Sequence, residues 1–348
     1  MVGDTTIKTN QDIAHSFAKH FQEKVDKVVK DCKIVHCLTV NQQQYDEVDF
    51  LTHEMLSKIV KTIKPKKSFG FDRVPTNVLL DSMPVTSESI LLLYRKILAS
   101  NEIPEQWKIA RIIPVYKKGD KKNIENYRPI SNLCAMAKLF ERFILAALEK
   151  VENKNEMSLT GQDQHGFKKG HSTVTAMLQI QAKMGDFLES KNLVALTSLD
   201  LSCAFDVVNH SLLVNKLREK RLPYSLVNIV ENWLQDRSAY VEVYNEQSDS
   251  FRVPYGTVQG SVLGPILFAI YISDIFEVEP VVIYADDNYL LTHGDDERAL
   301  QVTTEVQVNR LVTWLKSIGM CVNSKKTETI VFSRNKGCLL YTSPSPRD

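Results

Sequence analysis

The segment VVIYADDNYLL, residues 281–291, places two adjacent aspartates between two short apolar stretches. Apolar and aromatic residues precede Asp286 and Asp287, and three more follow Asn288. Burying two like charges in a core segment is opposed by desolvation and by their mutual repulsion. A hairpin avoids this cost, because two strand halves flanking residues 285–288 would leave the acidic pair at the tip. We therefore predict a β-hairpin that presents both carboxylates.

A second acidic position lies more than eighty residues before this hairpin. The segment LVALTSLD (193–200) is typical of a buried strand that ends at Asp200 and leads into a helix. Three carboxylates from two strand ends can hold two divalent cations about 3.5 to 4 Å apart, an arrangement that serves phosphoryl transfer. Each aspartate also has a simpler interpretation, Asp200 as a helix cap and the pair as turn residues.

Basic and acidic residues are segregated along the chain, although the net charge of its 348 residues is only +1. Between Lys61 and Arg128 there are 14 lysines and arginines against 7 acidic residues, a local excess of +7, whereas residues 274–297 are strongly acidic. This asymmetry suits a phosphate-rich ligand beside a bound cation. With 43% hydrophobic and 24% charged residues, the composition is that of a globular protein with one large or two smaller domains.

Six cysteines are scattered without a repeated short spacing, at positions 32, 37, 134, 203, 321 and 338. This pattern predicts reduced, mostly buried thiols in an intracellular protein. A zinc site built from Cys32, Cys37, His20 and His36 is the alternative, but their spacing is poor for tetrahedral ligation. The polar N-terminus predicts no signal peptide, and the apolar run at 262–272 is too short to span a bilayer.

The rest of the chain alternates between helical and extended patterns. Apolar residues recurring every four positions from Ile13 to Val25 predict an amphipathic helix. Further helices are predicted at 53–63, 87–100, 176–190 and 298–319, and also after the Arg-Pro pair at 128–129, after Asp200 and after the glycine-rich segment near residue 260. A strand is predicted at 109–116 with a lysine-rich hairpin tip at 117–120, extended chain is predicted at 321–334, and loops are predicted at 31–50, 64–75 and 153–173.

Several motifs occur in a fixed order: YRPIS at 127–131, LDLSCAFD at 199–206, VQGSVLGPILF at 258–268 and YADD at 284–287. Together they closely resemble the reverse transcriptases of non-LTR (LINE-type) retrotransposons, from about residue 50 to residue 335. The resemblance implies an α+β right-hand polymerase fold with fingers and an antiparallel palm sheet backed by helices. The thumb is expected to be largely absent, which makes the chain a fragment.

The implied domain organisation has four parts. Residues 1–49 form an N-terminal helical linker, 50–173 the fingers with part of the palm, and 174–336 the palm with the catalytic hairpin. Residues 337–348, GCLLYTSPSPRD, depart in composition from the rest and resemble translated adapter sequence. We therefore treat them as a non-native tail.

The resemblance implies an RNA-directed DNA polymerase that transfers nucleotides from deoxynucleoside triphosphates to a primer 3′-OH with two Mg²⁺ ions, for which Mn²⁺ can substitute. The implied partners are an RNA template, a DNA primer and the deoxynucleotides, with no membrane, and the family is expected in the nucleus and cytoplasm. The retrotransposon clade and the oligomeric state stay open. Rival interpretations are a group II intron type or domesticated reverse transcriptase, and a truncated, inactive fragment that binds RNA.

The resemblance also assigns the catalytic residues. Asp200, Asp286 and Asp287 match the catalytic triad. The resemblance makes Asp200 and Asp286 the main metal ligands, with Asp287 as a further, less permanent one and the Leu201 carbonyl as an additional one. Lys326 matches a lysine that protonates the departing pyrophosphate, although the neighbouring Lys325 can be aligned in its place.

Five further residues match nucleotide-binding positions of the family. Phe205 matches the bulky residue under the sugar that excludes a 2′-OH, and Gln259 with Gly260 matches the pair that contacts nucleotide and template. Lys117 and Arg128 match basic residues that grip the triphosphate, since an ammonium and a guanidinium fork suit phosphate oxygens. The simpler interpretations are a core phenylalanine, a structural glycine turn and a solvated charge cluster.

The chain departs from the family pattern in three places. Val258 stands where proline usually precedes the glutamine, Cys203 where lysine is common, and Phe69 and Phe71 where prolines usually flank Gly70. None of these changes removes an expected metal ligand, so we expect an intact site.

Overall fold

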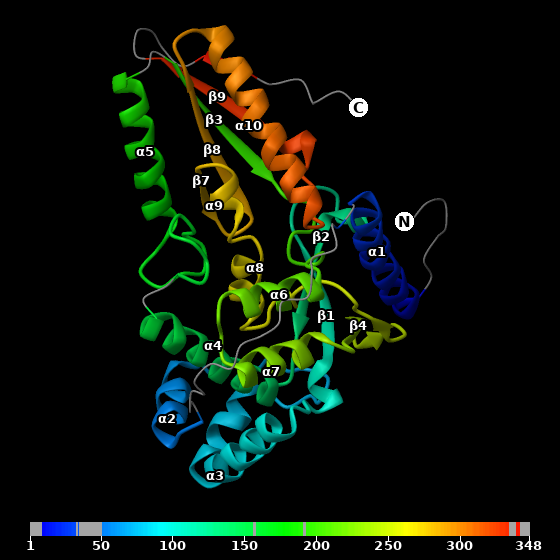
Figure 1. Cartoon of the computed structure of the whole chain (residues 1–348). Helices are drawn as coiled ribbons and strands as arrows, with labels where there is room; N and C mark the ends of the chain where they lie inside the picture. Colours follow the sequence, from blue (N-terminus) through cyan, green and yellow to red (C-terminus); the bar gives the residue numbers. More distant parts are fainter. Residues whose placement is uncertain are drawn as a thin grey trace. The chain divides into compact units, whose positions relative to one another are not determined.

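The computed structural model of the chain describes residues 9–32, 34, 51–155, 158–190, 193–333 and 339–341 (Figure 1). The chain forms two units that interleave in sequence. The first unit comprises Met1–Asp26, Cys37–Met157 and Asn209–Leu267, and the second unit comprises Lys27–His36, Ser158–Val208 and Phe268–Asp348. No helix within the described ranges is long and apolar enough to cross a membrane.

A mixed sheet organises the first unit. Its strands are β1 (Ile109–Tyr116), β2 (Tyr127–Asn132), β4 (Ser238–Val243), β5 (Glu246–Gln247) and β6 (Phe251–Arg252). Strand β1 pairs antiparallel with β2 and parallel with β4, and β5 and β6 both pair antiparallel with β4. The β1–β2 hairpin confirms the predicted strand at 109–116 and the lysine-rich connection that follows it.

Helices supply most of the core of the first unit. They are α1 (Asn10–Asp31), whose last residues belong to the second unit, α2 (His53–Thr62), α3 (Thr76–Ser100), α4 (Ala135–Asn155), α6 (His210–Glu219), α7 (Tyr224–Leu234) and the start of α8 (Gly264–Tyr271). At the centre, the fully buried Tyr94 ring of α3 lies 4.9 Å from the Phe140 ring of α4. The Tyr94 hydroxyl donates to the Met136 carbonyl at 2.8 Å, so this buried polar group is satisfied.

Helix α3 is longer than the sequence predicts. The expected helix covers 87–100, but the structure begins it at Thr76 and continues it through Pro84. A proline inside a helix removes one backbone hydrogen bond, and the predicted range lies wholly after it. The buried side chains of Leu79 and Met83, before the proline, give this first part of the helix apolar contacts that offset the loss.

An antiparallel sheet organises the second unit, in the order β10-β9-β3-β8-β7. Figure 1 labels the strands β9, β3, β8 and β7 of this sheet. The strands are β3 (Leu193–Asp200), β7 (Val281–Tyr284), β8 (Asp287–Gly294), β9 (Glu328–Ser333) and β10 (Leu339–Tyr341). Helices α5 (Thr173–Ser190) and α10 (Glu297–Ser317) pack against this sheet, and α9 (Ile275–Val278) packs against α10. The central strand β3 has the bounds that the sequence predicts, and its end carries Asp200.

Most of the other predicted elements are confirmed within a few residues. The helix from Ile13 to Val25 lies inside α1, and the helices at 53–63, 176–190 and 298–319 correspond to α2, α5 and α10. The predicted loop at 31–50 falls almost entirely outside the described residues. The sequence patterns described above predict no helix or strand within 221–252, where α7, β4, β5 and β6 lie. Part of the expected non-native tail, 339–341, pairs with β9 as β10.

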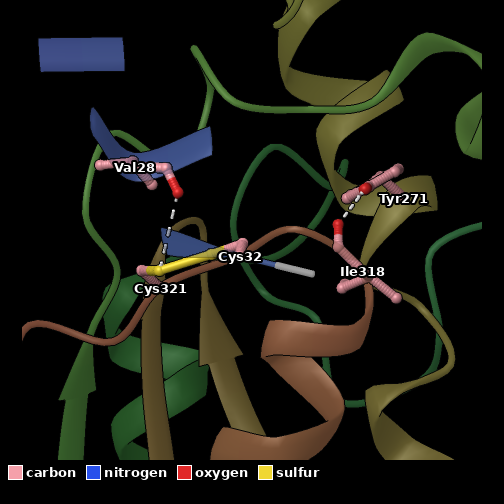
Figure 2. Close-up of a disulfide and its surroundings, with 5 residues drawn as sticks. All are labelled: Val28, Cys32, Tyr271, Ile318 and Cys321. Atoms are coloured by element: carbon pink, nitrogen blue, oxygen red, sulfur yellow. Dashed lines mark hydrogen bonds between the residues drawn. A yellow bond between two sulfur atoms is a disulfide. The ribbon is translucent and has the colours of Figure 1, made fainter. Parts of the chain in front are cut away.

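One cysteine pair corrects the expectation of reduced thiols. Cys32, after α1, and Cys321, after α10, form a disulfide in the second unit (Figure 2). The two residues are 289 positions apart in sequence with Cα atoms 6.8 Å apart, so no local spacing could predict the pair. The nearby Tyr271 hydroxyl donates to the carbonyl of Ile318, the residue that caps α10 (Figure 2). Cys37 and His36, two ligands of the alternative zinc site, lie outside the described residues, as does Cys338.

Candidate active site

The acidic hairpin is formed by β7 and β8. Tyr284 and Asp287 pair across it, which leaves only Ala285 and Asp286 in the turn. The prediction of a hairpin is confirmed, but its tip is shorter than expected, because Asp287 and Asn288 are the first residues of β8. Ala285 has φ +60°, the left-handed region that favours glycine. The Asn288 amide donates to the Asp286 carbonyl at 2.9 Å and so braces this turn from within.

Strand β3 brings the third carboxylate to the hairpin. Asp200 and Asp287 are direct partners in the antiparallel register of β3 and β8. Like charges at such opposed positions repel each other. The Asp287 side chain is exposed as a whole, yet desolvation of its carboxylate, followed by the charges of Asp286 and Asp200, raises its pKa. These three residues, the acidic cluster, are therefore close enough to interact electrostatically.

The segment after α10 holds Asp200 in place. The Asn323 backbone N–H donates to the Asp200 carbonyl at 2.8 Å, and the Asn323 amide donates to Oδ2 of the Asp200 carboxylate at 3.4 Å. The short helix η3 (Ser324–Lys326) then places Lys326 Nζ 3.0 Å from the same Oδ2. The Lys326 side chain is 64% exposed, so this ion pair contributes at most about 1 kcal/mol to stability. Of the two lysines that the sequence left open, Lys326 is the one that reaches Asp200.

A loop that precedes α5 braces the outer edge of the hairpin. Gln164 forms a parallel bridge with Ile283 of β7. Its fully buried side chain accepts hydrogen bonds at Oε1 from Gly166 N–H at 2.8 Å and from Ala285 N–H at 3.2 Å. Sequence reasoning missed this role, because a glutamine two residues before a glycine in a polar loop carries no distinctive signal.

The acidic cluster suits a hard cation by its chemistry, since carboxylate and carbonyl oxygens are the ligands that Mg²⁺ prefers. Within the described residues, no group of three or more His, Cys, Asp or Glu side chains is arranged so that it could hold a metal ion. Mg²⁺ is commonly held by one or two carboxylates together with substrate phosphates, so a protein cage of three side chains is not required. The oxygen donors that the chain brings to this end of the sheet are the carboxylates of Asp200, Asp286 and Asp287 and the backbone carbonyl of Leu201.

Leu201 and Phe205 follow directly on β3. Leu201 forms an isolated antiparallel bridge with Val322. The hydrogen bonds of this bridge run from the Asn323 N–H to the Asp200 carbonyl and from the Ser202 N–H to the Cys321 carbonyl, so they do not use the Leu201 carbonyl. The partly buried Phe205 ring packs on the buried Phe268 ring at 4.4 Å. Both residues therefore lie in the second unit, as does the acidic cluster.

The basic candidates lie in the first unit, at the β1–β2 hairpin. Lys117 follows β1 directly, and its backbone N–H donates to the Asn126 carbonyl at 2.8 Å, which closes the loop. The exposed Arg128 lies on β2 opposite Val115. A guanidinium and an ammonium on one hairpin are suited to binding phosphate oxygens.

The Gln259–Gly260 pair packs against the strand that carries Arg128. The Gln259 carbonyl accepts from the Ser131 N–H at 2.8 Å. Gly260 has φ +103°, and a Cβ atom there would lie 2.5 Å from the Ser131 carbonyl oxygen. Only glycine fits this close approach, so the pair has a structural requirement besides any binding role.

A buried carboxylate lies beneath this glycine-rich loop. Glu141 of α4 is fully buried, and its Oε2 accepts from the Val262 N–H at 2.9 Å. Desolvation raises the pKa of Glu141 to about 7, although the hydrogen bond from the Val262 N–H and, after it, the charge of the buried Arg237 guanidinium oppose that rise. Sequence reasoning did not single out this residue, because a glutamate in an amphipathic helix is normally solvated.

Comparisons with known proteins bear on these sites. Residues 116–342 match the family described as reverse transcriptase (RNA-dependent DNA polymerase). The chain is 28% identical over 351 residues to the probable RNA-directed DNA polymerase from transposon BS of Drosophila melanogaster, across 93% of this chain and 37% of that protein.

Two further relatives come from other mobile elements. The chain is 26% identical over 298 residues to the RNA-directed DNA polymerase from mobile element jockey of Drosophila melanogaster, across 82% of this chain and 32% of the relative. It is 25% identical over 264 residues to the retrovirus-related Pol polyprotein from type-1 retrotransposable element R2 of Popillia japonica, across 71% and 35%. The chain spans about a third of the length of these relatives.

Proposed function

The chain belongs to the reverse transcriptase family, and we propose that it is the polymerase part of a non-LTR retrotransposon protein, extending a DNA primer along an RNA template. The observation that carries this proposal is the register of β3 and β8, which sets Asp200 opposite Asp287 beside the Asp286 turn. Two strand ends that force three carboxylates together are costly for a fold, and they are useful where cationic charge is bound.

The proposed architecture is a right-hand polymerase with fingers at 50–173 and palm at 174–336. The antiparallel sheet of the second unit, with helices packed against it, supports the palm assignment. The basic β1–β2 hairpin, which lies within residues 50–173, supports the assignment of this segment to the fingers.

Asp200, Asp286 and the Leu201 carbonyl would hold the divalent cations, Mg²⁺ or in its place Mn²⁺. When bound, these cations supply charge neutralisation for the triphosphate and favour the ionised form of the primer 3′ oxygen. Asp287 is the partner of Asp200 in the strand register, and it adds negative charge that strengthens the attraction of the cluster for cations. Catalysis then rests on positioning and charge stabilisation by a preorganised site.

The remaining residues act on the nucleotide. Lys326 holds a proton at Nζ beside Asp200 and would donate it to the departing pyrophosphate. Phe205 would exclude the 2′-OH of a ribonucleotide. Lys117 and Arg128 would grip the triphosphate.

The loop with Gln259 and Gly260 would contact nucleotide and template. Its support is the close packing of Gly260 on β2, which brings the backbone of the pair next to the strand of Arg128. Deoxynucleotides, an RNA template and a DNA primer are thus the proposed substrates.

Primer extension on an RNA template with Mg²⁺ tests the proposal. The unsubstituted chain should incorporate deoxynucleotides, and Asp286→Ala should reduce the rate by at least about 10²- to 10³-fold, because charge stabilisation at the reacting centre is lost. Asp186→Ala on α5 is the matched control, since this exposed aspartate belongs to the same unit and should leave the rate unchanged. Equal incorporation in the Asp286→Ala and unsubstituted chains, or none in either while RNA still binds, would overturn the enzymatic proposal.

A further inference from the structure

An exposed aromatic ring lies against the side chain proposed to select the sugar. The Phe167 ring stands edge-on to the Phe205 ring, with centroids 6.0 Å apart and an interplanar angle of 81°. Phe167 is 53% exposed, whereas Phe268, the other ring against Phe205, is fully buried. Phe205 therefore lies against one buried ring and one exposed ring.

The backbone of Phe167 is in a conformation that such a residue rarely adopts. Its φ is +61°, in the left-handed region, where a bulky side chain is strained. Strain of this kind persists only where neighbouring contacts enforce it, and it is concentrated at functional sites. The ring is exposed and gains little packing of its own, so burial of the side chain does not explain this conformation.

The neighbouring residues enforce this conformation by attaching the loop to the acidic hairpin. Gly166 approaches Ala285 so closely that a Cβ atom would lie 2.2 Å from the Ala285 nitrogen. Gln164 Oε1 accepts from the N–H groups of both residues, and the His165 N–H donates to the Ile283 carbonyl at 2.8 Å. The loop that carries Phe167 is thus fixed to the turn that carries Asp286.

We propose that Phe167 is a specificity-determining positioning residue, whose ring holds Phe205 in the orientation that rejects a ribonucleotide. Phe268 supports Phe205 from the core, and Phe167 blocks the rotation of its ring toward solvent. Because the Phe167 loop is attached to the Asp286 turn, the sugar gate and the carboxylates keep a fixed spacing. The inference rests on the proposed function, in particular on Phe205 as the sugar gate.

Single-nucleotide primer extension with dATP and with ATP tests this inference through the ratio of their incorporation efficiencies. Phe167→Ala should lower the preference for dATP about tenfold while changing the rate with dATP little, because an edge-to-face aromatic contact is lost. Phe167→Tyr keeps the ring and should restore the preference. Phe167→Gly removes ring and strain together and should match Phe167→Ala, since the ring and not the backbone strain is responsible.

Phe187→Ala is the matched control, because this ring of the same unit packs on His293 at 4.5 Å, and its discrimination should equal that of the unsubstituted chain. Phe205→Ala distinguishes the role of Phe205 as the sugar gate from the role of Phe167 in positioning it. If Phe205→Ala admits ATP and Phe167→Ala does not, the inference about Phe167 is overturned and the gate stands. If Phe205→Ala leaves discrimination unchanged, the assignment of Phe205 as the sugar gate is overturned and the inference with it, whereas the polymerase proposal stands. If the unsubstituted chain incorporates nothing while RNA still binds, the polymerase proposal itself is overturned.

Two further outcomes are decisive. Equal losses with dATP and ATP in Phe167→Ala, together with weaker binding of the primer–template, would make Phe167 a stacking residue for nucleic acid and overturn the inference. If Phe167→Ala melts below the assay temperature, Phe167→Leu replaces it, since leucine fills similar space without an aromatic edge. Unchanged sugar discrimination in a folded Phe167→Leu chain would also overturn the inference.

Discussion

Replacing Glu141 by glutamine should stabilise the protein at alkaline pH. Glu141 is fully buried, and its Oε2 accepts from the Val262 N–H at 2.9 Å. Burial raises its pKa from 4.5 to about 7. The folded state therefore keeps the proton up to about pH 7, whereas the unfolded chain releases it near pH 4.5. The contribution of Glu141 to stability is therefore complete below pH 4.5 and is lost as the pH rises from 4.5 through 7.

The size of the effect follows from the two pKa values. At about 1.4 kcal/mol per pH unit, the window from 4.5 to 7 corresponds to about 3 kcal/mol of unfolding free energy. Glutamine stays neutral and keeps an oxygen that can accept from Val262. Glu141→Gln should thus be more stable than the unsubstituted chain by about 3 kcal/mol at pH 8, and by less than about 1 kcal/mol at pH 5.

Glu242 in the same unit provides a control with the opposite sign. It is also buried, but it pairs with Arg111 at 2.6 Å. Desolvation alone would raise its pKa, yet the hydrogen bonds and charge of Arg111 together with Gln247 lower it. A lowered pKa means that the stabilisation is present at neutral pH and is lost in acid. Glu242→Gln should destabilise the protein at pH 8 by about 3 to 5 kcal/mol, because Arg111 is left unpaired.

Urea unfolding at pH 5 and pH 8 measures both effects. The buried Trp233 ring, 4.5 Å from the Arg237 guanidinium, provides a fluorescence probe in the first unit. A Glu141→Gln chain that is no more stable than the unsubstituted one at pH 8 would refute the reasoning. A gain of the same size at both pH values would refute it as well, since the gain would then not come from the proton.

Two substitutions bear on the nucleotide-handling residues. Lys326→Ala should slow primer extension by about 10²-fold or more through loss of a proton donor. Its melting temperature should change little, because the ion pair with Asp200 is exposed. Lys325→Ala should extend the primer at the normal rate, and equal rates in the two variants would count against Lys326 as the proton donor. Gly260→Ala should lower stability by about 1 to 3 kcal/mol and raise KM for the nucleotide, because a Cβ would lie 2.5 Å from the Ser131 carbonyl. Gly170→Ala is the matched control, because Gly170 has φ +78° and no atom lies within 4 Å of an added Cβ, so this variant bears the backbone strain alone. Equal changes of the melting temperature in the two variants would exclude a steric clash at Gly260 as the cause.

The parts of the site that can be predicted from the sequence are those in which a charged residue lies within or at the end of an apolar segment. Two adjacent aspartates in an apolar segment predict the hairpin, and a buried strand pattern ending in Asp200 predicts the end of β3, whose bounds are confirmed. The length of the turn is not predicted, because Asp287 joins β8 through pairing with β3, a strand more than eighty residues away.

The residues that sequence reasoning misses act through distant partners. Gln164 matters because its amide oxygen reaches the Ala285 N–H, 121 positions later. Glu141 matters because Val262, also 121 positions away, brings its N–H to a carboxylate that is buried from solvent. Neither glutamine nor glutamate has an unusual local setting, so only the packing of the chain shows these roles.

The repulsion within the acidic cluster also explains why residues outside it must hold the ends of β3 and of the β7–β8 hairpin in place. Asp200 and Asp287 repel each other across the strand pair, and Ala285 adds the strain of a left-handed backbone at the turn. A fold that keeps this arrangement must restrain each strand end separately. Asn323 and Lys326 restrain the end of β3, and on the other side the amide of Gln164 restrains the turn. The supports therefore lie outside the acidic motif itself, and substitutions in them should affect the site even though the motif is unchanged.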